Sequence, residues 1–198
     1  AIDRRPQPAV RLGLNRARGL STDGAQRLLQ VRARRCHERG ISIARHGEPL
    51  TEFAFDDIQD LARACRLDKS DLQALASANT LTTLAGHRAN AHWEVAAIEP
   101  MPALLDNAPI NETPTMLAPL PEGKNIVADY RSLGLSMGRH PVALIRPKLA
   151  RFRVQKAEHL QQFPDGRLAR ASGLVTHRQR PATAKGVLFV TLEDETGQ

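Results

Sequence analysis

Apolar and polar positions follow two different periods along this chain. Between residues 21 and 98, apolar side chains recur every three to four positions, which is the spacing of a helix that buries one face. From Val154 onward the spacing shortens, and residues 186–193 alternate strictly between two faces, as in a β-strand. The change of period predicts an α+β protein whose helices precede its strands.

The first helix is predicted to follow Ser21, because a serine hydroxyl is a favourable N-cap. Its apolar stripe is expected to consist of Ala25, Leu28, Leu29, Ala33 and Cys36. Five arginines are expected to lie away from that stripe, namely Arg27, Arg32, Arg34, Arg35 and Arg39. We therefore expect this helix to bury one side and to present a basic side.

Three further helices are predicted before residue 98. The second is expected to start at Asp56, because Asp56 and Gln59 have the spacing of a capping box. The third follows Asp68, and the fourth covers residues 87–98. The apolar side of the fourth helix is expected to be formed by Ala89, Trp93, Ala96 and Ala97. Helices this short and closely spaced predict a small all-α domain over residues 1–98.

Residues 99–121 show neither period, and they hold six of the chain's thirteen prolines. This composition predicts a linker or an extended strap. If the strap contacts a partner protein, its large apolar side chains are the expected anchors: Met101, Leu104, Leu105 and Met116.

A connecting helical segment is expected over residues 122–150. Its one predicted helix has three side chains on the inner face, Ile126, Val127 and Tyr130. Gly138 and the pair His140-Pro141 are expected to end this helix, with His140 shaping a turn.

Two strands are predicted in the C-terminal part, at roughly residues 167–178 and 186–193. They are expected to be joined by a basic loop that contains Arg178, Arg180 and Lys185. Phe189 in the second strand is interpreted as a core residue, with stacking on a nucleotide base as the alternative. The acidic run over residues 193–195 is interpreted as a solvated strand end.

Two strands alone would leave unpaired backbone groups beside apolar side chains, an arrangement that natural proteins avoid. We therefore expect either that the native polypeptide continues past Gln198 with further strands, or that another chain completes the hairpin. Of these two alternatives, we favour the continuing polypeptide.

Charge is distributed unevenly along the chain, whose formal net charge is +7. Residues 1–46 carry eleven basic and three acidic groups, residues 47–145 carry seven and thirteen, and residues 146–198 carry ten and five. Basic ends around an acidic centre predict phosphate contacts at both ends, and a protein partner or no partner in the centre. The alternative is a surface generally coated with arginine.

Several functional classes are excluded by what the sequence lacks. No apolar run approaches the roughly 18 residues of a membrane helix, and no signal-peptide core is present, so we expect no membrane partner. Cys36 and Cys65 are the only cysteines, which excludes a disulfide framework and favours a reducing, cytoplasmic setting. No Asp-x-Asp pair, catalytic triad or phosphate-binding glycine loop occurs. We therefore expect no catalytic residue, metal site or cofactor in this segment.

Four stretches resemble a known protein family: GLNRARGLSTDGAQRLL (13–29), LAGHRANAHWEV (84–95), IVADYRSLGLSMGRHPVALIRPKL (126–149) and GLVTHRQRPATAKGVLFVTLEDETG (173–197). Together they resemble the C-terminal region of error-prone C-family DNA polymerases of the ImuC type, which are paralogues of the DNA polymerase III alpha subunit. The resemblance covers almost the whole chain and is weakest in the proline-rich stretch. The last two motifs are the specific ones, because their order and separation recur in that family.

The resemblance implies a tandem helix-hairpin-helix domain over residues 1–98, then the linker and connecting helix, then an incomplete OB-fold β-barrel over residues 151–198. It implies a non-catalytic DNA-binding and partner-docking segment of a translesion polymerase, an enzyme of DNA damage repair and SOS mutagenesis. The parent protein would be a DNA-directed DNA polymerase, a nucleotidyltransferase whose Mg²⁺-binding aspartates lie in a palm outside this segment. The alternatives are the same region of a replicative DNA polymerase III alpha subunit and a pure protein-interaction module.

The resemblance also implies partners and a location. DNA would be bound through its backbone, without sequence specificity. A second partner would be an ImuB-type mutasome protein, an inactive Y-family relative, and through it the sliding clamp. A cytoplasmic, nucleoid-associated location follows from these partners.

The DNA-binding residues are expected at the first hairpin and in the basic loop between the strands. The hairpin maps to residues 18–21, where Ser21 replaces the second glycine that is usual in the family. The full expected set is Arg16, Arg18, Gly19, Ser21, Arg27, Arg178, Arg180 and Lys185. The alternative for the first hairpin is a plain helix connector, and the second hairpin, over residues 77–81, is expected to be structural because it has no glycine. The OB-fold part is expected to bind single-stranded DNA or a protein.

Overall fold

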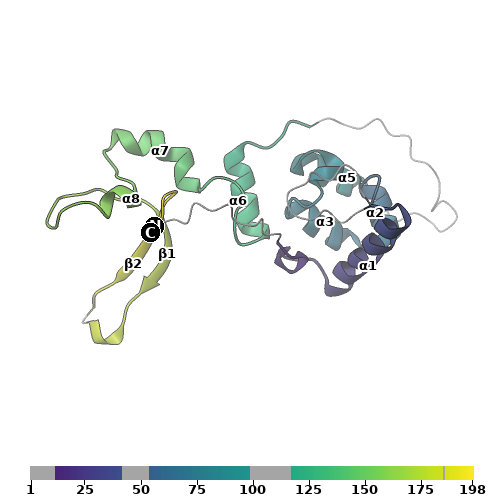
Figure 1. Cartoon of the computed structure of the whole chain (residues 1–198), viewed down its shortest axis with the longest axis horizontal. Coiled ribbons are helices and arrows are strands. Elements are labelled where there is room, and N and C mark those ends of the chain that lie inside the picture. Colours follow the sequence, from purple (N-terminus) through teal and green to yellow (C-terminus); the bar gives the residue numbers. More distant parts are fainter. Residues whose placement is uncertain (1–11, 42–53, 99–116, 185) are drawn as a thin grey trace. The chain divides into compact units, whose positions relative to one another are not determined.

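The computed structural model describes residues 12–41, 54–98, 117–184 and 186–198. Figure 1 shows their elements, which in chain order are η1 (Leu14–Arg16), α1 (Thr22–Glu38), α2 (Ile58–Cys65), α3 (Lys69–Ser77), α4 (Thr82–Ala85), α5 (Arg88–Ala97), α6 (Glu122–Ser132), α7 (Pro141–Arg151), α8 (Ala157–Leu160), β1 (Leu174–Gln179), η3 (Ala182–Ala184) and β2 (Phe189–Glu193). Helices come first and strands last, so the predicted α+β class is confirmed. The helix-hairpin-helix and OB-fold assignments stay predictions.

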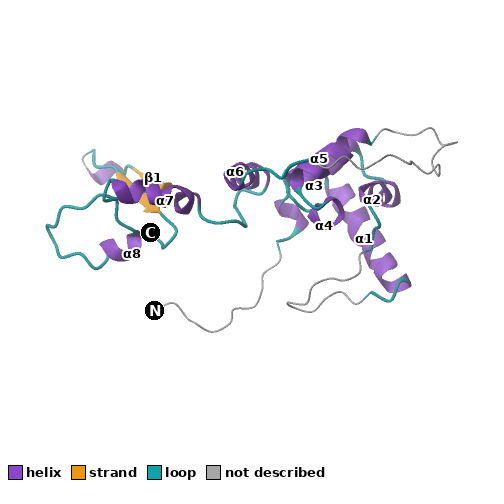
Figure 2. Ribbon diagram, turned by 90° about the horizontal axis from the view of Figure 1, so that it is seen from above, coloured by secondary structure: helices purple, strands orange, loops and turns teal. Residues whose placement is uncertain are grey.

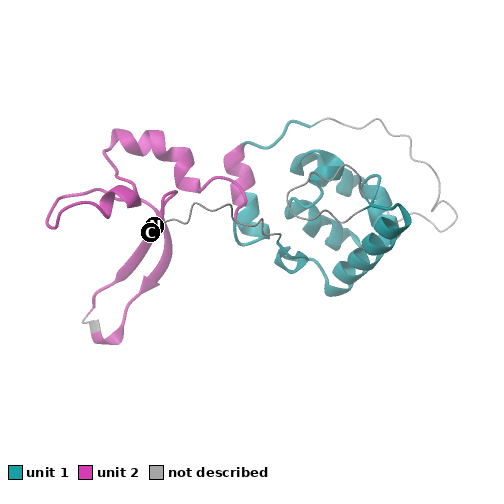
Figure 3. Cartoon of the chain, in the orientation of Figure 1, with its two compact units in different colours: residues 1–121, 128–135 teal, residues 122–127, 136–198 magenta. Residues whose placement is uncertain are grey.

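The chain divides into two compact units, coloured separately in Figure 3. Unit 1 consists of residues 1–121 and 128–135, and unit 2 consists of residues 122–127 and 136–198. The described regular structure of unit 1 is entirely helical, whereas unit 2 contains both strands (Figure 2). The predicted domain boundaries at residues 98, 121 and 150 stay predictions.

The helices of unit 1 begin at side-chain caps. The Ser21 hydroxyl accepts a hydrogen bond from the Gly24 amide at 2.9 Å, so the predicted cap of α1 is confirmed. Asp68 caps α3 in the same way, as predicted. The prediction for α2 was wrong by one residue, because its cap is Asp57, whose carboxylate accepts from the Asp60 amide at 2.6 Å.

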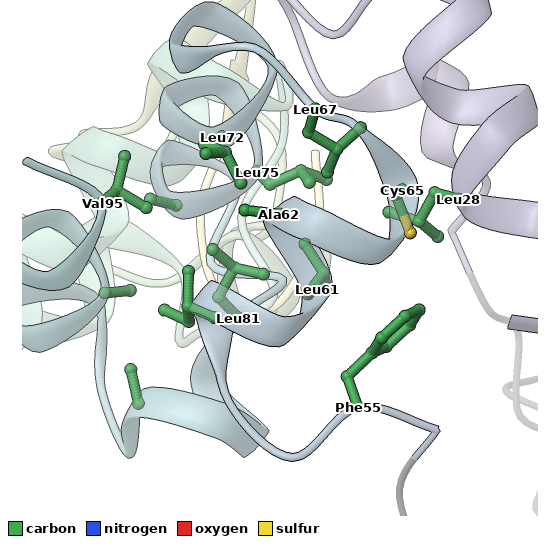
Figure 4. Packing of buried hydrophobic residues seen from close by; sticks show 14 of the residues in the cluster. Leu28, Phe55, Leu61, Ala62, Cys65, Leu67, Leu72, Leu75, Leu81 and Val95 are labelled. Carbon is green, nitrogen blue, oxygen red and sulfur yellow. The ribbon is translucent and has the colours of Figure 1, made fainter. Parts of the chain in front are cut away.

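One hydrophobic core holds unit 1 together. Side chains from α1, α2, α3 and α5 converge in Figure 4, and Ile58, Cys65, Leu72, Leu75 and Val95 are each 1% exposed. Truncating such a leucine to alanine costs about 2–5 kcal/mol in other proteins, because it leaves a cavity. This cluster therefore fixes how the helices of unit 1 pack.

The predicted apolar stripe of α1 is only partly the buried one. Leu28 and Cys36 are buried as predicted, but Leu29 is 44% exposed and Ala33 is also exposed. The buried stripe starts instead at Gly24. The spacing of apolar side chains did not predict this, because glycine has no side chain.

The predicted inner side of α5 is wrong. Trp93 is 52% exposed, and Ala96 and Ala97 are exposed with it. The buried side contains Arg88 and Asn90 together with Ala91 and Val95. Two of these are polar groups whose partners come from elsewhere in the chain, so the periodicity of apolar residues alone selected the wrong face.

The connecting segment contains more helix than predicted. In α6, Ile126 is buried as expected, but Val127 is 50% exposed and Tyr130 is 39% exposed, contrary to the prediction. His140 does not end a helix but begins one, because its Nδ1 accepts from the Val142 amide at 3.2 Å and caps α7. Pro141 takes the first position of α7, where its fixed φ is favourable.

The strands of unit 2 form an antiparallel pair that is shorter than predicted. Gln179 faces Phe189 and Leu174 faces Glu193, with an irregularity between Val175 and His177. Every residue of β1 is exposed. The described residues therefore contain one two-stranded sheet, in which β1 is exposed throughout and the last three residues of β2 are partly buried.

The acidic end of β2 is buried, contrary to its interpretation as a solvated end. Asp194 is 5% exposed, and its carboxylate accepts hydrogen bonds from the Ala157 amide at 2.9 Å and from Arg146 at 3.0 Å. It also accepts from the amide and hydroxyl of Thr196, at 2.8 and 2.6 Å. These donors offset the desolvation of the carboxylate. Asp194 thereby joins α7, α8 and the end of β2.

Candidate nucleic-acid interface

The first hairpin of unit 1 presents a tight turn between η1 and α1. Gly19 lies in this turn with a φ of +90°, a conformation that strains any residue with a Cβ. Arg16, Arg18, Gly19 and Ser21 are all exposed. The turn therefore presents two guanidinium groups and a glycine backbone to solvent.

A buried carboxylate fixes the start of α1. Asp71 of α3 is fully buried, and it accepts from the Ser21 amide at 2.8 Å and from the Ser21 hydroxyl at 3.0 Å. A carboxylate at a helix N-terminus is stabilised by the helix dipole. Sequence analysis missed this residue, because Asp71 lies fifty positions from Ser21 and has the pattern of an ordinary first-turn acid.

The two predicted phosphate ligands before the turn are held by the end of α6. Arg16 donates to the Leu133 carbonyl and Arg18 donates to the Arg131 carbonyl, both at 3.1 Å. The Arg18 amide also donates to the Ser132 carbonyl at 2.9 Å. A guanidinium has several N–H donors, so each side chain can bind one carbonyl and still meet a phosphate.

Arg27 occupies a different position from Arg16 and Arg18. Its side chain donates to the Cys65 carbonyl at 3.0 Å and to the Arg66 carbonyl at 3.2 Å, at the C-terminal end of α2. Its charge lies 3.8 Å from the buried Asp71 carboxylate. The structure thus uses Arg27 to join α1 to α2 and α3, which sequence analysis did not foresee.

Two further arginines of α1 are paired within unit 1. Arg35 forms a bidentate ion pair with Asp60, and this hydrogen-bonded pairing lowers the pKa of the Asp60 carboxyl. Arg39 pairs with Asp56 at 2.9 Å. The prediction that both lie away from the packed side was wrong for Arg35, which is half-buried. Part of the basic charge of residues 1–46 is therefore neutralised by Asp60 in α2 and by Asp56 just before it.

The second hairpin, over residues 77–81, packs beside the first. Ala17 and Ala78, one from each turn, are buried in a common cluster with Leu133. Asn79 has a φ of 59°, so an asparagine takes the left-handed conformation that a glycine would otherwise supply. The sequence lacked a glycine here, but the turn forms nevertheless. Its expected structural role stays a prediction.

The predicted binding residues of unit 2 lie on and beside the strand pair. Arg178 is in β1 rather than in the loop, where it faces Val190, and Arg180 follows the strand. Both are exposed, and neither guanidinium group has a hydrogen-bond acceptor among the described residues. Phe189 is 55% exposed, so its interpretation as a core residue does not hold for the described part of the chain.

Some predicted residues lie outside the described ranges. They are Lys185, Met101, Leu104, Leu105 and Met116. Within those ranges, no group of three or more His, Cys, Asp or Glu residues is placed to hold a metal ion. No described helix has both the length and the apolar character to cross a membrane.

Comparison with known proteins finds relatives of this chain among error-prone DNA polymerases. No protein-family model matches it. An error-prone DNA polymerase of Bordetella parapertussis is 50% identical over 192 residues, which is 96% of this chain and 16% of that protein. Error-prone DNA polymerases of Burkholderia pseudomallei and Alkalilimnicola ehrlichii are 48% and 44% identical, over 96% and 97% of this chain and 16% and 17% of their own lengths. By sequence, this chain is a relative of the error-prone DNA polymerases.

The similarity confirms the family inferred from the four motifs. It extends over both units, because it covers 96% of the chain. The chain spans about a sixth of the length of these error-prone DNA polymerases. The aligned part therefore represents a limited portion of each relative.

Proposed function

We propose that this chain is a non-catalytic DNA-binding and partner-docking segment of an error-prone translesion DNA polymerase. The similarity to error-prone DNA polymerases supports the polymerase context. Such an enzyme serves DNA damage repair and damage-induced mutagenesis, and it works in the cytoplasm at the nucleoid. Its nucleotidyl transfer would use Mg²⁺ held by aspartates in another part of the protein. The same region of a replicative polymerase is the alternative.

The exposed first hairpin is the observation that supports DNA binding best. The amides of Gly19 and Thr22 have no hydrogen-bond partner among the described residues, and both residues are exposed. Amides at a tight turn and a helix N-terminus bind phosphate oxygens. Arg16 and Arg18, held by the end of α6, add charge at the same place. This chemistry recognises the phosphate backbone and carries no base specificity.

The test replaces both hairpin arginines and measures binding to a DNA duplex over a range of salt concentrations. Because each lost phosphate contact removes about one unit from the salt slope, Arg16→Ala with Arg18→Ala is expected to flatten the slope by about one to two. A matched control is Arg32→Ala with Arg63→Ala, which removes two exposed charges elsewhere in unit 1.

A second pair of variants separates charge from structure. Arg16→Lys with Arg18→Lys keeps both charges but loses the planar fork that binds the carbonyls of α6. This variant is expected to keep the wild-type salt slope even if its melting temperature falls. An alanine variant with an unchanged slope would exclude the phosphate role of the hairpin.

A partner-docking role is supported by the outer side of α5. Trp93 is 52% exposed there, beside Ala96 and Ala97, in the acidic central part of the chain. Exposed tryptophans are common anchors of protein interfaces. By family resemblance the partner would be an ImuB-type mutasome protein, and the sliding clamp through it. Titration calorimetry with that protein is expected to show at least about tenfold weaker binding for Trp93→Ala.

A further inference from the structure

The C-terminal end of α6 is capped by a part of the chain that lies far from it in the sequence. A helix leaves the carbonyl groups of its last turn without partners inside the helix. In α6 the Tyr130 carbonyl still accepts from an amide of the same segment, at 3.1 Å. The next three carbonyls, those of residues 131–133, all accept hydrogen bonds from Arg16 and Arg18. The first hairpin therefore satisfies the end of α6.

Both the backbone and the side chains of the hairpin take part in this contact. The Arg18 amide donates to the Ser132 carbonyl at 2.9 Å, and the two guanidinium groups donate to the carbonyls on either side of it. The Leu133 side chain is 8% exposed and packs in one cluster with Ala17, which lies between the two arginines. All of these residues belong to unit 1. The end of α6 is thus docked on the hairpin at several points.

The two guanidinium groups meet at Gly134, which follows α6 directly. Gly134 is exposed and has a φ of +78°. A Cβ added there would lie 3.1 Å from Nη2 of Arg18 and 3.5 Å from Nη2 of Arg16. The terminal nitrogens of both arginines therefore flank the same point in space. Any side chain other than that of glycine would occupy this point.

The charges gathered at Gly134 are not balanced by acids. Two guanidinium groups held this close repel each other. Among the described residues, no acid forms an ion pair with Arg16 or Arg18. The carbonyls at the end of α6 carry partial negative charge and offset only part of the repulsion. An anion that contacts both groups would offset the rest, and phosphate suits guanidinium groups because it accepts several of their N–H bonds at once.

We propose that the end of α6 is part of the phosphate site of the first hairpin, and that Gly134 is its positioning residue. The carbonyls of α6 orient Arg16 and Arg18, and the missing side chain of Gly134 leaves their Nη2 atoms free to bind one phosphate together. This proposal rests on the DNA-binding function proposed above and adds a condition to it. The hairpin binds duplex DNA at full strength only when the end of α6 is in place.

The test compares two glycines of unit 1 that share a φ of +78°, Gly134 and Gly86. Alanine strains the backbone at both positions, but a Cβ at Gly86 would meet no atom within 4 Å. In the full chain, Gly134→Ala is therefore expected to weaken duplex binding about fivefold at low salt, whereas Gly86→Ala is expected to leave it unchanged. An equal loss in both variants would overturn the proposal, because backbone strain alone would explain it.

A double-mutant cycle asks whether Gly134 acts through the two arginines. In a background of Arg16→Ala with Arg18→Ala, Gly134→Ala is expected to weaken duplex binding by less than about twofold, because no guanidinium group remains to be displaced. Low salt keeps the binding of this background measurable. A loss as large as in the wild-type background would exclude a positioning role.

A second variant keeps the test valid if alanine disturbs the fold. Asn79 has a φ of 59°, so an asparagine takes a positive φ elsewhere in this unit. Gly134→Asn therefore adds a Cβ with less backbone strain, and it is expected to weaken duplex binding as alanine does while lowering the melting temperature less. An asparagine variant with wild-type affinity would overturn the proposal whatever alanine does.

The failure of this proposal is distinguishable from failure of the hairpin as a phosphate site. If Arg16→Ala with Arg18→Ala flattens the salt slope while both Gly134 variants bind like the wild type, the hairpin binds phosphate without help from α6, and only this inference fails. If the arginine variant keeps the wild-type slope, both proposals fail.

Discussion

Two glycines near the first hairpin serve different physical purposes. Gly19 permits a positive φ in the turn, whereas Gly24 lies inside α1 and permits close approach of a neighbouring side chain. A Cβ added at Gly24 would lie 2.2 Å from an Asp71 carboxylate oxygen. Asp71 cannot move away without losing its bonds to Ser21. At this position the tertiary contact, and not the backbone conformation, requires glycine.

The first prediction follows from that contact. Gly24→Ala is expected to destabilise unit 1 by about 2 kcal/mol or more, because the buried Asp71 must shift. Gly123→Ala is the matched control, since its Cβ would meet Leu144 at an ordinary 3.7 Å in the first turn of α6. The control is expected to be neutral or stabilising. Urea unfolding followed by Trp93 fluorescence measures the first variant, and thermal melting compares both. Equal effects of the two substitutions would contradict this account of Gly24.

Asp194 gives unit 2 an acid-sensitive contact. Burial acts to raise the pKa of this carboxyl, but hydrogen bonds from Thr196 and Ala157 and the charge of Arg146 outweigh it and lower the pKa to about 2. A carboxyl whose pKa falls on folding stabilises the fold above its unfolded pKa, near 3.8, and that contribution is lost as the pH falls towards 2. We estimate the contribution at neutral pH as about 2 kcal/mol.

The second prediction concerns this contact. The Ala157 amide, which donates to Asp194, is expected to lose protection from hydrogen exchange between about pH 4 and pH 2. Asp194→Asn is expected to lower this protection already at pH 7 and to remove its dependence on acid. A wild-type protein that keeps the protection at pH 2 would show that Asp194 does not hold α8.

At the scale of elements, α6 is attached by two ion pairs of very different burial. Arg88 of α5 pairs with Asp129, and their side chains are 2% and 11% exposed. Arg139 pairs with Glu122 at the start of α6, and their side chains are 63% and 44% exposed. Removing one partner of a buried pair leaves an uncompensated charge, whereas an exposed pair is screened by water.

The third prediction is a pair of double-mutant cycles on these contacts. Asp129→Leu alone is expected to cost about 3 kcal/mol or more, because Arg88 remains buried and charged. Arg88→Met combined with Asp129→Leu is expected to cost clearly less than the two single changes together. The same cycle on Arg139 and Glu122 is expected to show no measurable coupling. Additive effects at the buried pair would contradict its proposed role in joining α5 to α6.

At the scale of the whole molecule, ion pairs within each unit determine which arginines keep an unpaired charge. The +7 net charge is reduced locally wherever arginines pair within a unit, as Arg35 does with Asp60 and Arg146 does with Asp194. The exposed first hairpin keeps Arg16 and Arg18 without an acidic partner among the described residues. One exposed acid, Asp23, lies in the first turn of α1, two residues after Ser21.

The fourth prediction uses that acid. Asp23 would repel a phosphate bound at the hairpin, so Asp23→Asn is expected to strengthen duplex binding by roughly threefold at low salt. The gain is expected to shrink as salt increases, because exposed charges are screened. Glu38→Gln makes the same change of charge at the other end of α1 and is the control. An equal gain in both variants would indicate a general charge effect and no phosphate site at the hairpin. Anisotropy titrations at two salt concentrations measure these affinities.

Local signals were sufficient for some features of this protein. Ser21 and Asp68 were recognised as helix caps because a cap depends on a few neighbouring residues. The order of helices before strands followed from the spacing of apolar residues. The family resemblance followed from four short motifs. Each of these features is encoded within one segment of the chain.

Other features depend on which segments meet in space. The exposed side of α5 around Trp93 was mistaken for the core, because the buried side is polar and is satisfied by Asp129 and by residues near 117. Helix α7 was missed because Gly138 and the pair His140-Pro141 were interpreted as the end of a helix, whereas His140 caps α7 and Pro141 is its first residue. Asp194 was interpreted as a solvated acid because its donors lie in distant segments.

The amino-acid sequence by itself therefore determined the class of fold, several helix starts and the family resemblance of this chain. Only the tertiary structure decided which faces are buried, that Asp71 fixes the first hairpin, and that Arg16 and Arg18 cap the end of α6. The physical reason is that a helix cap and the periodic spacing of apolar residues each involve only a few neighbouring residues. Burial of a polar or charged group is favourable only when a partner far along the chain satisfies it.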